Sequence, residues 1–95
     1  MSPTLQIIPT TERGKVILEI TGELDETSCG ALDECLAEHG RPGARIVLDL
    51  RSLNFIDASG VALLHRISNR SSDEGWAFAV RTTGGRYLAS RATSA

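Results

Sequence analysis

The sequence predicts a small α/β domain in which a mixed sheet of about four strands carries its helices on one face, with a shortened C-terminal part. Residues 46–50 are an apolar run, interrupted by Asp49 alone, that is typical of a buried strand, and apolar residues then recur at helical spacing from Gly60 to Ile67. The predicted order is strand, helix, strand, helix, strand, and such crossover connections are almost always right-handed. If the three strands are neighbours, both helices therefore cover the same face.

The N-terminal residues predict an antiparallel hairpin. Residues 5–8 suit a short strand, and Pro9 marks it as an edge strand or a strand end. We expect residues 10–14 to form a polar turn. Over residues 15–21 apolar and polar side chains alternate, so we expect one face of this strand against the core and the other partly exposed to water.

The first predicted helix begins at Asp25 or Thr27 and runs to about His39, because Gly40 and the following Pro42 end it. Its apolar side contains both cysteines, Cys29 and Cys35. Six residues apart on one helix, they are separated by about 9 Å of helical rise. That exceeds the limit of about 7 Å between the Cα atoms of a disulfide, so we expect buried, reduced thiols.

The central stretch joins a strand to the second helix through the turn Asp57-Ala58-Ser59-Gly60. Either Asp57 or Ser59 can cap this helix, and its free amides can hold an anion. Gly60 predicts close approach of a neighbouring strand or of a partner's backbone. We expect residues 71–75 to form a polar loop and residues 76–80 a strand.

Residues 81–95 contain few large apolar side chains and two adjacent glycines. We expect one short helix over residues 86–90 and disorder in the rest. The chain is thus divided into one domain over residues 1–80 and a tail over residues 81–95.

Composition excludes several functions. The net charge is −2 and no basic stripe stands out, which argues against a nucleic-acid partner. No signal-peptide pattern and no apolar run near the roughly 18 residues of a membrane span is present. We therefore expect a cytoplasmic protein with no membrane insertion.

The candidate chemistry for an enzyme is sparse. His39 and His65 lie on different predicted helices, and two cysteines six apart on one helix cannot share a tetrahedral zinc ion. No phosphate-binding loop, dinucleotide fingerprint or nucleophile elbow is present. Asp25, Asp49 and Asp57 can be interpreted as converging carboxylates or as two helix caps and a strand end. We predict no enzyme, no cofactor and no metal site.

Two motifs carry a family resemblance. LDLRSLNFIDASGVALL, residues 48–64, resembles the signature of the STAS family, whose bacterial single-domain members are anti-sigma factor antagonists. Upstream, Thr21-Gly22-Glu23-Leu24-Asp25 resembles the family's approach to its first helix, and the similarity runs over residues 15–80. The resemblance implies an anti-sigma factor of the serine kinase type as partner, and a phosphatase as a further candidate. Family members usually have a further strand and a final helix after the part that corresponds to residues 15–80, and we expect this region to be shortened here.

The acidic turn departs from the family pattern. In the antagonists it reads Asp-Ser-Ser-Gly or Asp-Ser-Thr-Gly, and the residue after Asp is phosphorylated, whereas this chain has Ala58. Ser59 is the nearest hydroxyl, either a helix cap or a displaced phosphoacceptor. One residue further on, it is turned by about 100° around the helix.

The resemblance and the predicted helix faces together give a candidate partner-binding surface. It comprises Glu23, Asp25, Asp57, Ala58, Ser59, Gly60, Ala62 and Arg66. A second interpretation is a STAS-like regulatory subunit on the ATPase of an ABC transporter of lipids, where phosphorylation is not required. Ala58 favours this second interpretation.

Overall fold

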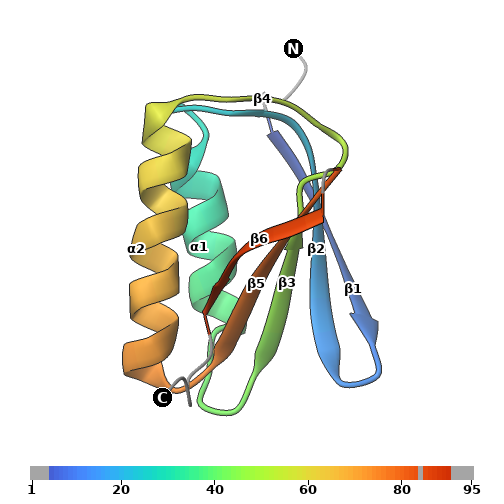
Figure 1. The fold of residues 1–95 in the computed structure, drawn as a ribbon, viewed down its shortest axis with the longest axis vertical. Coiled ribbons are helices and arrows are strands. Elements are labelled where there is room, and N and C mark those ends of the chain that lie inside the picture. The colour runs from blue at the N-terminus through green and yellow to red at the C-terminus, as the bar shows by residue number, and fades with distance from the viewer. Residues whose placement is uncertain (1–4, 84, 91–95) are drawn as a thin grey trace.

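The structure, a computed structural model, describes residues 5–83 and the backbone of residues 85–90. Two helices pack beside one sheet (Figure 1). In chain order the elements are β1 (Leu5–Glu12), β2 (Lys15–Leu24), α1 (Cys29–His39), β3 (Arg45–Asp49), β4 (Leu53–Ile56), α2 (Ala58–Glu74), β5 (Ala77–Thr82) and β6 (Gly85–Ser90).

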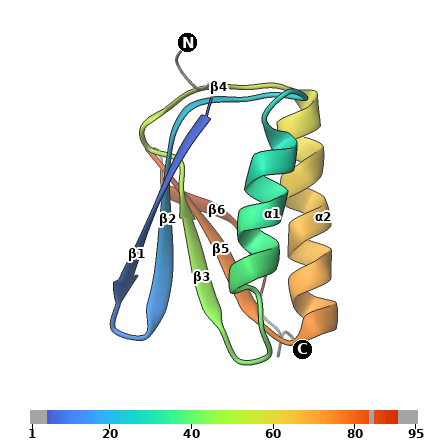
Figure 2. The ribbon, with the colours of Figure 1, turned by 180° about the vertical axis from the view of Figure 1, so that it is seen from behind.

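The sheet is mixed, in the order β1-β2-β3-β5-β6. Strands β2, β3 and β5 are parallel, while the outer pairs β1–β2 and β5–β6 are antiparallel. Both helices lie on the same face of this sheet (Figure 2), which confirms the predicted fold class and the N-terminal hairpin. The described residues form six strands, more than the expected four or so. The prediction missed β4, a strand of four residues that pairs with the end of β2, and it placed a helix where β6 lies.

The core lies between the sheet and the helices. On β2, Leu18 and Ile20 are buried while Glu19 between them is exposed, as the alternation predicted. Trp76 and Phe78 are both about 1% exposed and meet edge to face, with ring centroids 6.1 Å apart. Among the described residues, no helix covers the second face of the sheet (Figure 2).

Both helix boundaries differ from prediction. Helix α1 begins at Cys29, because residues 25–28 form a turn held by Asp25. Helix α2 continues through the expected loop to Glu74. There Ser71 is fully buried and its hydroxyl donates to the Ser68 carbonyl at 2.8 Å, so a buried polar side chain is satisfied inside the helix.

The helix expected over residues 86–90 was wrong, since this segment is strand β6. Its register runs from Thr82↔Gly85 to Phe78↔Ser90, so its partner is β5. Pairing along a sheet edge depends on the neighbouring strand, which local composition does not reveal. Residues 91–95, the end of the tail expected over residues 81–95, lie outside the described residues. The division of the chain at residue 80 stays a prediction.

Candidate functional site: the end of the molecule at the start of helix α2

Asp57 connects the sheet to helix α2. Its backbone N–H donates to the Leu24 carbonyl at 3.1 Å, and its carboxylate accepts from the Gly60 N–H at 3.0 Å. The second bond is an N-cap, which satisfies one of the free amides of the first helical turn. Of the two capping residues left open by the sequence, the structure selects Asp57. Ala58 and Ser59 thus become the first two residues of the helix.

Gly60 is buried where helix α2 meets the end of β2. A Cβ atom here would lie 2.7 Å from Ile56 Cγ1 and 2.8 Å from the Leu24 carbonyl oxygen. Both distances are too short for carbon, so glycine is required for close packing. The predicted close approach is therefore that of the neighbouring strand, and direct contact of Gly60 with a partner stays a prediction.

Asp25 organises the loop between β2 and α1. Its Oδ1 atom accepts from the Thr27 N–H at 2.9 Å and from the Thr27 hydroxyl at 2.6 Å. These bonds, the one from the Thr27 hydroxyl above all, lower the pKa of Asp25. The Ser28 hydroxyl donates to the Glu23 carbonyl at 2.8 Å and accepts from the Asp25 N–H at 3.0 Å. The loop thus carries a fixed negative charge.

The two loops lie at the same end of the molecule (Figure 1). At the start of α1, burial raises the pKa of the Cys29 thiol, the charge of Asp57 raises this pKa further, and the charge of Arg66 lowers it. Most of the predicted partner-binding residues are therefore gathered here. Glu23, Ala58, Ala62 and Arg66 are exposed, and Asp25, Asp57 and Ser59 are half-buried.

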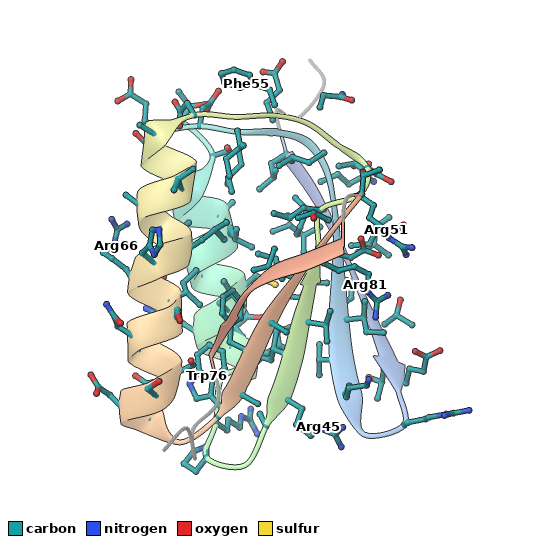
Figure 3. The ribbon with its side chains drawn as sticks, viewed as in Figure 1. Arg45, Arg51, Phe55, Arg66, Trp76 and Arg81 are labelled. Carbon is teal, nitrogen blue, oxygen red and sulfur yellow. The ribbon has the colours of Figure 1, made fainter. Side chains whose placement is uncertain are left out.

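Two exposed apolar residues at this end were missed by sequence reasoning. Phe55 on β4 is 52% exposed, and Val61 on α2 is 44% exposed. Phe55 lies opposite Glu23 in the β2–β4 register and at the top of the molecule (Figure 3). Of the two, only Val61 could have been predicted to be exposed, because it falls outside the apolar stripe of its helix.

Asp49 lies at the end of a strand and does not belong to the loops that contain Asp25 and Asp57. It is 5% exposed at the end of β3, and Arg51 binds both its oxygens, with Nε at 3.0 Å and Nη2 at 2.9 Å. These bonds hold the pKa of Asp49 below its usual value. Among the described residues no group of three His, Cys, Asp or Glu side chains is placed to hold a metal ion. Cys29 and Cys35 are free and half-buried.

The family model described as "Mlab, STAS domain" matches residues 9–91. The chain belongs to the STAS family. Comparison with curated proteins gives no match for this STAS domain. Within the described residues, none of its helices is long and apolar enough to span a bilayer.

Solved structures share the fold of this STAS domain. An anti-sigma factor antagonist from Mycobacterium paratuberculosis superposes with a TM-score of 0.65 at 20% identity, covering 81% of this chain and 68% of its own. An anti-sigma factor antagonist STAS domain from Rhodobacter sphaeroides gives 0.62 at 19% identity, covering 85% and 87%. An uncharacterised protein with a SpoIIAA-like fold from Shewanella loihica gives 0.52 at 15% identity, covering 88% and 74%.

Proposed function

We propose that this STAS domain is an anti-sigma factor antagonist. It binds an anti-sigma factor of the serine kinase type and thereby releases a sigma factor for transcription. The docking surface is the end of the molecule at the start of α2, formed by Glu23, Asp25, Asp57, Ala58, Ser59 and the exposed side of α2 at Ala62 and Arg66. Family membership is the observation on which the proposal rests, supported by the antagonist neighbours in fold.

The geometry of this end supports protein docking better than catalysis. Ala58 and Ala62 are small and exposed one helical turn apart, so a partner's backbone can approach this side of the helix closely. Asp57 and Gly60 are used to fix the helix against β2. We place no catalytic residue at this end and predict no enzyme.

Ala58 affects regulation. It is the exposed first residue of α2, at the position where the antagonists carry their phosphorylated hydroxyl. Since alanine cannot accept a phosphoryl group, we propose that the protein stays in the form competent to bind its partner. Its activity is then controlled by its abundance or by another input.

The alternative is a regulatory subunit on the ATPase of an ABC transporter of lipids. Ala58 favours it, because no phosphorylation is required there. A pull-down from extract of the source organism with the full chain as bait, followed by mass spectrometry, separates the two. A kinase-type anti-sigma factor supports the proposal, whereas an ABC ATPase contradicts it.

The docking surface is tested by adding a bulky charge to α2. Ala62→Arg should abolish binding of the captured partner and leave the melting temperature nearly unchanged, because Ala62 is exposed. Ala37→Arg, at an exposed position of α1 away from the loop, is the matched control. Equal affinity of the wild type and of the Ala62 variant removes this side of α2 from the surface.

A further inference from the structure

We infer that Phe55 is the anchor of the docking surface, and that it enters an apolar pocket bordered by Arg or Lys side chains on the partner. This inference rests on the proposed function and names the partner's chemistry. It starts from the three large apolar side chains that are exposed among the described residues with side chains, Ile8, Phe55 and Val61. Single exposed apolar residues are common and need no explanation. Two of these three, however, flank the first turn of α2.

The surroundings of Phe55 distinguish it from Ile8. Phe55 borders a shallow hollow of about 430 Å³ between β4 and the end of β5. On the β4 side the lining is apolar apart from Asn54, and on the β5 side it carries hydroxyls. It consists of Leu50, Leu53, Asn54, Phe55, Ile56, Thr82 and Thr83. An aromatic ring beside such a hollow offers a partner both a protruding contact and a recess.

Phe55 is not part of the hydrophobic core. About half of the Phe55 surface faces water, and the other side chains of β4 that approach the core, Leu53 and Ile56, are aliphatic. Phe, Tyr and Trp are enriched at the centre of protein interfaces, where burying one of them contributes more than most other residues. Phe55 therefore fits the role of such a centre.

The charge around Phe55 defines the partner. Glu23 lies directly opposite it, and Asp57 follows two residues later. Residues 16–40, which lead into and through α1, contain seven Asp or Glu residues and no Lys or Arg. Of the arginines nearby, Arg51 is already bound to Asp49, and Arg66 is the exposed basic side chain on the α2 side of the docking surface. A partner whose pocket is bordered by basic side chains is complementary to this rim, and a second acidic surface is not.

Binding of Phe55→Ala to the purified kinase-type anti-sigma factors of the source organism tests the inference. We expect the dissociation constant to rise by about 30-fold or more, the effect of losing a strong hot spot. Ile8→Ala is the matched control, because Ile8 is similarly exposed, at 43%, on the edge strand β1. It should change the constant less than about twofold. If Phe55→Ala fails to fold, Phe55→Leu, which keeps an apolar side chain without the ring, replaces it.

The basic rim is tested separately through salt. Raising NaCl from 50 to 500 mM should slow association of the wild type on the order of tenfold. Association of the double variant Glu23→Gln, Glu26→Gln should depend less on salt. A wild type whose association is insensitive to salt contradicts the basic rim.

The remaining outcomes separate this inference from the proposed function. Unchanged affinity of Phe55→Ala, with tight wild-type binding, overturns the anchor and leaves the function intact. Absence of wild-type binding to every such anti-sigma factor overturns both. If the wild type is a dimer that Phe55→Ala converts to a monomer, the occupant is a second copy of this chain and the assigned partner is wrong.

Discussion

At Gly60 the chain has no room for a side chain, and the position of the α2 N-terminus depends on this contact. We expect Gly60→Ala to lower the free energy of unfolding by about 2 kcal/mol, because the added methyl group meets the Leu24 backbone oxygen, which cannot rotate away. Urea unfolding measures the change. Gly30→Ala in α1 is the control: apart from the backbone of its own helix and its chain neighbours, no atom lies within 4 Å of the added Cβ, so it should stabilise by roughly 0.5–1 kcal/mol. Equal effects of the two variants contradict this account.

Asp49 and Arg51 link stability to pH. The Arg51 hydrogen bonds lower the folded-state pKa of Asp49 below its unfolded value of about 3.9. The resulting stabilisation is therefore present above that value and is lost as the pH falls through the folded pKa. We expect Arg51→Ala to flatten the fall of the free energy of unfolding below about pH 4. Urea titrations at several pH values measure the slope.

Arg45→Ala is the control for this pair. Arg45 is exposed at the other end of the same strand, β3, and its side chain lies far from that of Arg51 (Figure 3). Its removal should leave the pH dependence as in the wild type. An Arg51 variant with the wild-type slope contradicts a stabilising role for the pair.

Among the elements, helix α2 shows which boundaries depend on special backbone geometry. It ends at Gly75, which has a φ of 82° and donates its N–H to the Ser71 carbonyl. A left-handed residue with a side chain costs about 1–2 kcal/mol, less for asparagine. We expect Gly75→Ala to destabilise by about that amount and Gly75→Asn by less, measured by thermal unfolding. The reverse order contradicts the assigned helix end.

The elements also show how far sequence reasoning reaches. The hairpin, the central parallel strands and the apolar side of α2 were predicted because burial imposes a period on the sequence. The strand β6 was missed, since its partner is fixed by the edge of β5. Ser71 was assigned to a loop, because the pattern does not reveal that a hydroxyl is satisfied within the helix.

The candidate site, too, could be predicted from the sequence only in part. The cap at Asp57 and the close contact at Gly60 each agree with one of two readings that the turn sequence allowed. The exposure of Phe55 was not predicted, because a residue in a four-residue strand can face either side of the sheet. Only the pairing of β4 with β2 determines that side.

At the scale of the whole molecule, we propose a domain that binds its partner without a phosphorylation switch. A phosphoserine brings −1.5 to −2 charges. The amides at a helix N-terminus tolerate this charge, so the fold would survive it. The phosphate weakens partner binding, because it must lose its hydration water at the interface. Only a group of opposite charge on the partner would offset this cost in free energy. Ala58 has no hydroxyl at the exposed first residue of α2, and this off-state is therefore absent.

Incubation of the purified chain with its cognate kinase and ATP, followed by peptide mass spectrometry, tests this absence. We expect no stoichiometric phosphate on the wild type, since Ser59 is half-buried and turned by about 100° from the preceding position. Ala58→Ser should acquire phosphate at residue 58 and then lose partner binding, while the unphosphorylated variant binds like the wild type. Stoichiometric phosphate on Ser59 together with loss of binding contradicts the absence of a phosphorylation switch, because the switch then lies one residue further along the chain. Ser59→Ala distinguishes the two cases, since it changes nothing if Ser59 is silent and locks the protein in the bound form if Ser59 is the switch.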